Sequence, residues 1–335
     1  MDVVIRGDGV AAYCCAHLLH KAGLQVALEH VDRPRLPAIM LGEQAIALIR
    51  DVFEQPGLFH DLPRIEKRVV AWGPGAKAVA VEHSAVVVSE KVLLENIRPV
   101  LLPECNPTQE ACWTVFAARP LPAHTVEHCF GSRMASTVPV ALKHSSDPGA
   151  CWIESLENGW LFLVPSSPPS GWLLAVGEAP EVLAGRSRVV AAELAHRSSS
   201  SGEFPAYARI ASPLCAPGWL ACGPAAMAFD PICGDGTAHA IREAILASAV
   251  IRALANGGSA DALLSHYEAR LTAGFRRHLI LCRSFYQSGG TTALWRAELD
   301  AIDRGIQWCD AQLDPQLKRG AGFRYRLRGF ELEAV

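Results

Sequence analysis

The sequence is poor in charged residues, which make up 19% of its 335 positions, whereas half of the residues are hydrophobic. Disordered chains show the opposite composition, so the sequence predicts a folded protein. No apolar run approaches 18 consecutive residues, and we therefore expect no transmembrane segment. The net charge is −3, which argues against a nucleic-acid partner, because such binders neutralise phosphates with an excess of lysine and arginine.

Metal and disulfide signatures are also missing. The 11 cysteines contain no C-x-x-C pair and the 12 histidines no H-E-x-x-H motif, so the usual spacing of zinc ligands is absent. The chain opens on a strand-like run rather than a signal peptide, which does not fit a small secreted disulfide scaffold. We predict no metal site, a cytoplasmic location, and reduced cysteines that act mostly as small buried apolar residues.

The first 30 residues carry the pattern of a nucleotide-binding unit. A β-branched strand over Val3–Arg6 runs into G-D-G-V-A-A, which matches G-x-G-x-x-A, and a helix and a second strand follow. Gly7 permits the tight turn, Gly9 lets a pyrophosphate approach the backbone, and Ala12 keeps the helix close to the sheet. The helix start offers free N–H groups to phosphates, so the unit predicts dinucleotide binding. The alternative is an ordinary βαβ unit with a glycine turn.

An acidic residue ends the second strand of this unit. Glu29 follows Gly7 by 22 positions, close to the spacing of about 20 that places a carboxylate on a ribose. A carboxylate there accepts hydrogen bonds from a free 2′-hydroxyl and repels a 2′-phosphate. The predicted nucleotide is therefore FAD or NAD rather than NADP.

A second glycine-rich segment lies far along the chain, over residues 218–256. A short apolar strand, Trp219–Cys222, leads into Gly223 and Pro224. An Asp-Pro pair at 230–231 then precedes a glycine turn at 234–236 and a long amphipathic helix, which Thr237 is expected to cap.

This segment resembles the flavin-binding "GD" motif of FAD-dependent monooxygenases of the para-hydroxybenzoate hydroxylase class. The matching residues are Gly223, Ala225, Ala226, Asp230, Pro231, Gly234 and Gly236. The resemblance implies FAD as the cofactor, with the turn at 230–236 beside the isoalloxazine ring. It also implies that the following helix points its N-terminus at the N1–C2=O edge, where reduced flavin carries negative charge.

Other segments are similar to the flavin-dependent halogenase branch of the same superfamily. Leu41–Gln44 looks like the G-E-S/T-L segment of that branch, which makes Glu43 a candidate near the cofactor. The paired apolar runs within 159–176 look like strands of the substrate domain, and Phe130–Arg133 resembles the end of the D-x-x-G-R strand.

The chain departs from these families in three places. Pro224 replaces the aspartate of the GD motif, which contacts the ribityl chain in the family, and proline supplies neither an acceptor side chain nor a backbone donor. The D-G motif of the NADPH-using hydroxylases is absent, and no second G-x-G-x-x-G offers a nicotinamide domain. The W-x-W-x-I-P motif of the halogenases is missing as well, which argues against halogenation.

Two residues near the expected ring position are candidates for catalysis. Asp235 is either a general base or a cap of the helix, and His239 is either a polar group at the ring or a structural histidine. Arg242 and Glu243 are expected to form surface pairs on the helix.

The predicted fold is α/β: a Rossmann-like FAD-binding domain with an inserted, mostly antiparallel β-sheet domain for substrate and a C-terminal helical region. Tryptophans expected on the inserted strands either form an aromatic substrate pocket or simply pack. The predicted domains are 1–62, 122–137 and 205–258 for FAD, 63–121 and 138–204 for substrate, and 259–335 for the helical region.

The resemblance implies an FAD-dependent oxidoreductase, most simply an oxygen-using monooxygenase. Its substrate would be a small aromatic molecule or a residue of a partner protein, as in the building of tryptophan-derived quinone cofactors. Electrons would come from a separate flavin reductase or directly from NAD(P)H. The alternative is a degenerate flavin fold that serves as a non-catalytic binding or maturation partner, and Pro224 is its main support.

Overall fold

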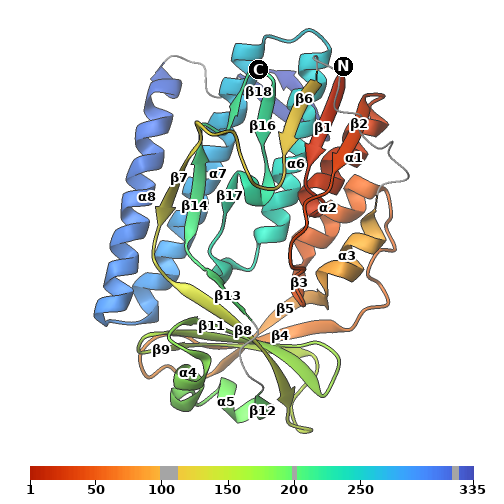
Figure 1. Ribbon diagram of the computed structural model, residues 1–335. Coiled ribbons are helices and arrows are strands. Elements are labelled where there is room, and N and C mark those ends of the chain that lie inside the picture. The colour runs from red at the N-terminus through yellow and green to blue at the C-terminus, as the bar shows by residue number, and fades with distance from the viewer. Residues whose placement is uncertain (99–111, 198–201, 319–323) are drawn as a thin grey trace.

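The computed structural model describes residues 1–98, 112–197, 202–318 and 324–335 (Figure 1). Two sheets that follow one another along the long axis of the molecule dominate it, and both chain ends lie at the end that holds β1 (Asp2–Arg6) and β18 (Tyr325–Arg328). None of the described helices combines the length and the apolar character needed to cross a membrane.

The first sheet contains the expected βαβ unit and has five strands. In spatial order they are β15 (Cys215–Ala216), β16 (Trp219–Ala221), β6 (Cys112–Phe116), β1 (Asp2–Arg6) and β2 (Gln25–Glu29). β1 pairs in parallel with both β2 and β6, and only β15 runs antiparallel to its neighbour β16. The strands predicted at 3–6 and 25–28 are thus confirmed.

Two helices cover this sheet in direct mutual contact. They are α1 (Val10–Lys21) and α6 (Gly236–Ala255). Alanine and cysteine make up most of the buried face of α1, and such short side chains let two helix backbones approach closely. The Cys15 thiol reaches the Ala244 carbonyl at 3.5 Å, which ties the N-terminal unit to the distant glycine-rich segment.

The second sheet is the expected, mostly antiparallel insertion and has nine strands. In spatial order they are β12 (Leu194–Arg197), β8 (Met134–Leu142), β11 (Ser170–Gly177), β10 (Gly159–Pro165), β9 (Ala150–Leu156), β4 (Arg64–Ala71), β5 (Val79–Val88) and β3 (Ile39–Gly42), with β13 (Gly202–Pro205) also paired to β8. Only β4 and β9 pair in parallel. Trp160 donates to the Tyr286 hydroxyl at 3.1 Å, and Trp72 meets Trp160 and Trp295 edge-on, so these tryptophans pack in the core.

The predicted domain boundaries need two corrections. β6 was expected in the inserted sheet but pairs with β1, and β3 was expected in the FAD-binding part but pairs with β5. Both are short apolar strands, and a local apolar pattern does not identify the strand with which it pairs.

The remaining elements connect and cover the two sheets. A three-stranded sheet of β17 (Met227–Ala228), β14 (Ala208–Ser212) and β7 (Val126–Phe130) lies between them. The shorter helices are α2 (Glu43–Phe53), α3 (Glu90–Ile97), α4 (Pro180–Arg186), α5 (Val190–Glu193) and the 3₁₀ turns η1 (Gly223–Ala225) and η2 (Pro231–Cys233).

The C-terminal region is helical, as expected. Two long helices, α7 (Ala260–Gly289) and α8 (Ala293–Lys318), pack along one side of the molecule and reach from the first sheet to the second (Figure 1). The chain ends in a hairpin of β18 (Tyr325–Arg328) and β19 (Glu331–Ala334). One face of α7 is buried along the length of the helix, at Leu263, Tyr267, Leu271, Phe275, Leu279 and Cys282.

A buried arginine joins the helical region to the turn before α6. Arg133 donates to the Asp230 carboxylate at 2.6 Å and forms an ion pair with Glu298 of α8 at 2.9 Å. Its guanidinium carbon lies 3.8 Å from the centre of the Tyr286 ring. All three charged side chains are at least 97% buried, so each charge depends on its partners.

We expect Arg133→Leu to lower the free energy of unfolding by about 3–5 kcal/mol, because it leaves two buried carboxylates without their cation. Urea denaturation measures this change. Arg276→Leu is the matched control: it breaks an exposed pair with Asp310 and should cost less than about 1 kcal/mol. Equal losses in the two variants would contradict the assigned importance of the buried pairs.

Candidate functional site

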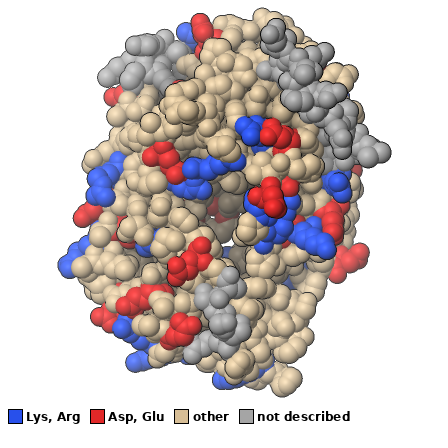
Figure 2. Space-filling model, viewed as in Figure 1, with Lys and Arg blue, Asp and Glu red and all other residues tan. Residues whose placement is uncertain are grey.

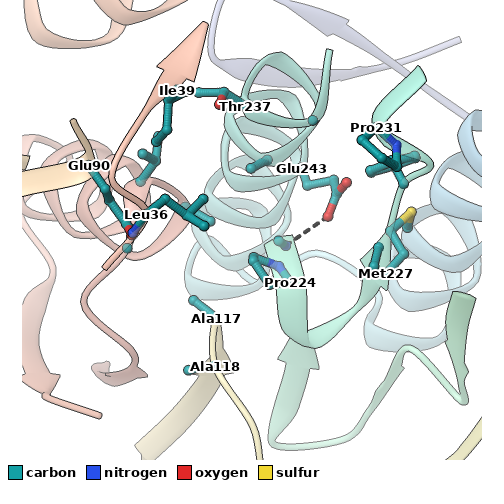
Figure 3. Close-up of a pocket in the computed structure, with 18 of the residues that line it drawn as sticks. Leu36, Ile39, Glu90, Ala117, Ala118, Pro224, Met227, Pro231, Thr237 and Glu243 are labelled. Atoms are coloured by element: carbon teal, nitrogen blue, oxygen red, sulfur yellow. Dashed lines mark hydrogen bonds between the residues drawn. The ribbon is translucent and has the colours of Figure 1, made fainter. Parts of the chain in front are cut away.

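A cleft of about 620 Å³ lies where the N-terminal unit meets the segment before α6 (Figure 3). One wall comes from the start of α1 and from the stretch between β2 and β3, and the other comes from residues 223–243. Figure 2 shows this face of the molecule hollowed at its centre, with charged side chains of both signs around the opening. The cleft therefore lies between two segments that the sequence separates by more than 180 residues.

Two helices begin at this cleft without side-chain caps. Gly9 is the N-cap residue of α1, and Asp235 is the N-cap residue of α6. Gly9 has no side chain, and the Asp235 side chain accepts no hydrogen bond from the first N–H groups of its helix. The first N–H groups of a helix lack intrahelical partners, and the helix dipole makes that end positive. Both helix starts therefore suit a ligand that carries negative charge or acceptors at two separated points.

Backbone crowding fixes two of the predicted glycines. Gly7 has a φ of +130°, and a Cβ atom there would lie 3.1 Å from the Ala118 backbone. Gly223 has a φ of +57°, and its Cβ would lie 2.7 Å from that of Ala11. A side chain at either position would therefore clash with a neighbouring segment of the chain. Ala12 is fully buried, as close packing of the helix requires.

The turn that resembles the flavin family lines the cleft over much of its length. The lining includes Gly9 from the first motif and Gly223, Asp230, Pro231, Gly234, Gly236 and Thr237 from the second. Asp230 directs its carboxylate inward, to Arg133 and to the Ile232 N–H, and thus shapes the turn. The expectation that Thr237 caps α6 is wrong, because the helix begins one residue earlier, at Gly236.

Two of the predicted acidic residues lie outside the cleft wall. Glu29 forms an ion pair with Arg6 at 2.9 Å across the strand pair β1–β2, and its role at a ribose stays a prediction. Glu43 is exposed at the start of α2 and pairs with Arg64 and Ser84 of the second sheet. Its hydrogen bond from Ser84 lowers the pKa of Glu43. A contact between Glu43 and the cofactor stays a prediction.

Two ion pairs stand at the mouth of the cleft. Arg35 forms a bidentate ion pair with the buried Asp8, and Arg33 forms a bidentate ion pair with Glu90. Glu90 also accepts the Leu36 N–H at 2.8 Å, which fixes the loop after β2. Arg33 lies close over Gly9, so a cation stands beside the uncapped start of α1.

The two predicted catalytic residues face a second cavity, which adjoins the cleft and shares Met227, Phe229 and Glu243 with it. Asp235 and His239 are joined by a bond of 3.0 Å and line a cavity of about 740 Å³, partly covered by Phe330 of the C-terminal hairpin. Burial raises the pKa of Asp235, but the hydrogen bond and charge of His239, together with His278, bring it below its ordinary value. His239 also stacks on Phe229, with ring centres 4.1 Å apart. Asp235 is thus neither a side-chain cap nor placed as a base in the cleft, and catalysis by either residue stays a prediction.

Glu243 is the residue that the sequence did not reveal. It was expected at the surface beside Arg242, but only 6% of it is exposed and it lines the cleft. Its Oε2 accepts the Gly223 N–H at 2.7 Å, and its Oε1 finds no hydrogen-bond partner among the described residues. Burial raises the pKa of its carboxyl group well above the ordinary value. One signal existed: Glu243 follows Gly236 by seven residues, which places both on one helix face.

No protein-family model matches the sequence, and no curated protein matches it. Solved structures do match in fold. The peptidyl tryptophan dihydroxylase QhpG, essential for tryptophylquinone cofactor biogenesis, superposes with a TM-score of 0.72 at 18% identity over 99% of this chain and 86% of its own. The flavin-dependent halogenase CmlS gives 0.73 at 16% identity, over 99% and 83%.

Aklavinone-11 hydroxylase, solved with FAD and aklavinone, matches as well. Its TM-score is 0.63 at 14% identity, over 86% of this chain and 69% of that enzyme. The fold similarity thus covers both the first sheet with its helices and the inserted sheet. The chain has the fold of the superfamily of FAD-dependent monooxygenases and flavin-dependent halogenases, as its two glycine motifs predict.

Proposed function

We propose that this protein is an FAD-dependent oxidoreductase of the monooxygenase type. The observation that carries the proposal is the pair of uncapped helix starts, α1 and α6, at one cleft. FAD presents a pyrophosphate and, some distance away, a flavin ring edge that becomes negative on reduction, and these are the groups that two such helix ends stabilise. When bound, the flavin supplies the redox chemistry with oxygen, and the protein positions and tunes it.

The residues present fit this cofactor. Gly9 and the first N–H groups of α1 would hold the pyrophosphate, with Arg33 beside them. Gly236, Thr237 and the other N–H groups at the start of α6 would face the ring edge. Glu243 offers an unpartnered carboxyl oxygen next to Pro224, where the family's ribityl-binding aspartate is missing (Figure 3). A neutral Glu243 can both donate and accept, so it suits a ribityl hydroxyl.

The proposed substrate is an aromatic small molecule or an aromatic residue of a partner protein. The fold match to QhpG, a peptidyl tryptophan dihydroxylase, supports the second possibility. We propose hydroxylation rather than halogenation because the W-x-W-x-I-P motif is absent from the sequence. A separate flavin reductase, or NAD(P)H directly, would supply electrons. The free cysteines of the described chain support a reducing compartment such as the cytoplasm.

One observation favours a second function. Pro224 removes the carboxylate that the flavin families place at this point, and a chain that cannot retain FAD would act as a non-catalytic binding or maturation partner. Glu243 distinguishes the two functions, because it supplies a carboxyl group to the same part of the cleft.

We expect the purified protein to bind one FAD, to be yellow, and to release FAD when ADP is added in excess. Flavin absorbance after gel filtration measures the stoichiometry. Oxygen consumption with NADH, with and without an added flavin reductase, then shows whether the chain needs an external electron source. A colourless protein that FAD cannot reconstitute would favour the non-catalytic function.

Glu243→Leu should raise the dissociation constant for FAD about tenfold, because a buried hydrogen-bonding partner is lost. Glu243→Gln keeps a donor and an acceptor and should stay close to the native value. Quenching of flavin fluorescence measures both. Glu268→Gln is the control: it changes a partly buried glutamate that accepts a backbone N–H, from Leu214, outside the cleft wall. A dissociation constant for FAD in Glu243→Leu equal to the native value would show that Glu243 does not contact the cofactor.

Glu243 also predicts how stability changes with pH. Its pKa is raised by burial in the folded chain, so the native state keeps a proton that the unfolded chain loses above about pH 4.5. Its stabilising effect is therefore complete at low pH and is lost as pH rises towards the folded pKa. Relative to the native apoprotein, the free energy of unfolding of Glu243→Gln should rise by up to about 1.4 kcal/mol for each pH unit above about pH 5, until the folded pKa of Glu243 is reached. Urea denaturation at several pH values measures the gain, and parallel curves would contradict it.

A further inference from the structure

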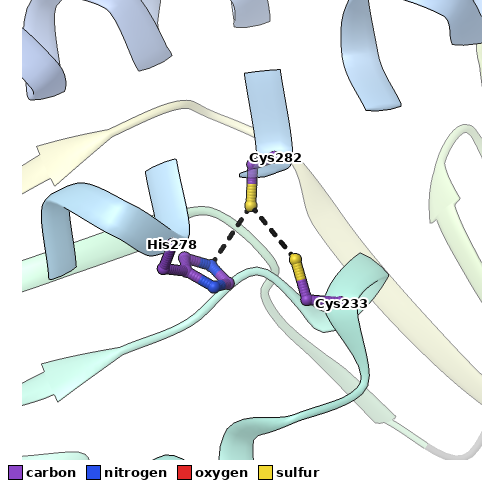
Figure 4. A group of neighbouring side chains, drawn as sticks. All are labelled: Cys233, His278 and Cys282. Carbon is purple, nitrogen blue, oxygen red and sulfur yellow. Dashed lines mark hydrogen bonds between the residues drawn. The ribbon is translucent and has the colours of Figure 1, made fainter. Parts of the chain in front are cut away.

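A cluster of two cysteines and a histidine lies directly behind the cleft turn (Figure 4). Cys233 ends the 3₁₀ turn η2, and His278 and Cys282 lie one helical turn apart on α7. The sulfur atoms of Cys233 and Cys282 are 3.6 Å apart, and the Cys282 sulfur lies 3.2 Å from Nε2 of His278. Cys282 and His278 are buried, whereas Cys233 is partly exposed, so reagents can approach the cluster at Cys233.

Cys233 is chemically distinct from the other described cysteines. The hydrogen bond from Cys282 and the neighbouring His278 lower the pKa of Cys233 to about 7, against the opposing effect of burial. Burial instead raises the pKa of Cys14 and Cys215, and it raises that of Cys309 to about 12. Because the thiolate is the reactive form of cysteine, Cys233 is more nucleophilic at neutral pH than Cys14, Cys215 or Cys309.

The same three side chains have the ligand types of a metal site, but their bonds argue against one. The Asp230 N–H donates to Nε2 of His278 at 2.9 Å. This bond uses the lone pair of Nε2, the ring nitrogen that lies next to Cys282 and that would have to bind the metal. The other ring nitrogen, Nδ1, lies 4.0 Å from the Asp235 carboxylate. A metal at the sulfur atoms would have to displace the Asp230 N–H, and the cluster is therefore better suited to thiol chemistry.

We propose that Cys233 and Cys282 form a dithiol that peroxides oxidise to a disulfide, linking the cleft turn to α7. The Cys233 thiolate attacks one peroxide oxygen and the O–O bond breaks. Cys233 becomes a sulfenic acid, and the departing hydroxide takes a proton to become water. The Cys282 sulfur then attacks the Cys233 sulfur, an S–S bond forms, and the hydroxyl group leaves as water with the Cys282 proton. Two thiols lose two electrons and one hydrogen peroxide becomes two water molecules.

The position of the disulfide gives it a consequence for the cleft. Cys233 lies between Pro231 and Gly234, which both line the cleft. To bond, the sulfur atoms must approach by about 1.6 Å, and this draws the turn towards α7. Oxidation would then change the setting of the N–H groups at the start of α6. This consequence for FAD rests on the proposed function, whereas the disulfide itself does not.

The test uses the full-length apoprotein treated with hydrogen peroxide. We expect a mass loss of about 2 Da and a peptide cross-link between Cys233 and Cys282, reversed by dithiothreitol. Cys282→Ser should instead accumulate a sulfenic acid at Cys233, trapped by dimedone. Cys309→Ser is the matched control, since it changes a buried cysteine outside the cluster and should leave the cross-link intact.

Three outcomes would overturn the proposal. The first is a native chain that keeps both thiols under peroxide, and the second is a cross-link that joins other cysteines. The third is a native chain that purifies with one zinc ion, protects both thiols until a chelator removes it, and loses zinc in Cys282→Ser. If FAD fails to bind but the cross-link forms, the proposed function fails and the dithiol stands.

Discussion

The buried guanidinium of Arg133 is the interaction on which the site depends. It balances one carboxylate from the cleft turn, Asp230, and one from α8, Glu298, over the face of a tyrosine of α7. A single cation thus fixes the relative positions of the turn, both C-terminal helices and the strand that enters the second sheet. Because neither carboxylate is tolerated in the interior without it, the turn has one stable setting. The cleft inherits its shape from that setting.

The cleft offers backbone N–H groups, rather than unpaired cationic side chains, to a negatively charged ligand. The starts of α1 and α6 present free N–H groups, and the arginines at the mouth are already paired with Asp8 and Glu90. Such a site selects a ligand by the separation of its acceptors more than by total charge. Glu243 adds one polar group inside the cleft, where Pro224 gives none, and burial raises the pKa of that group well above its ordinary value. The same fold can therefore retain a carboxyl contact while moving it from the strand end to the helix.

Local features of the sequence predicted much of the fold. The strand–helix–strand unit and the turn at 230–236 were predictable because neighbouring residues determine them, through glycine conformation and helix periodicity. Features that depend on distant contacts were not. The partner of β6 is chosen by pairing across the chain, and Glu43 turns to Arg64 of another sheet. Asp235 and Glu243 lie only eight residues apart and look alike in the sequence. The packing of α6 buries Glu243 and leaves Asp235 in an ion pair with His239.

The contact between α1 and α6 has a consequence for synthesis of the chain. Cys15 and its partner Ala244 are 229 residues apart, so the apolar face of α1 leaves the ribosome long before the helix that covers it. At 5–20 residues per second, that interval is roughly 10–45 seconds. During it the N-terminal unit exposes alanines, cysteines and unpaired strand edges, which are the features that make a partly folded chain prone to aggregation. The cleft therefore forms only after α6 has been made, and until then the face of α1 that contacts α6 stays exposed.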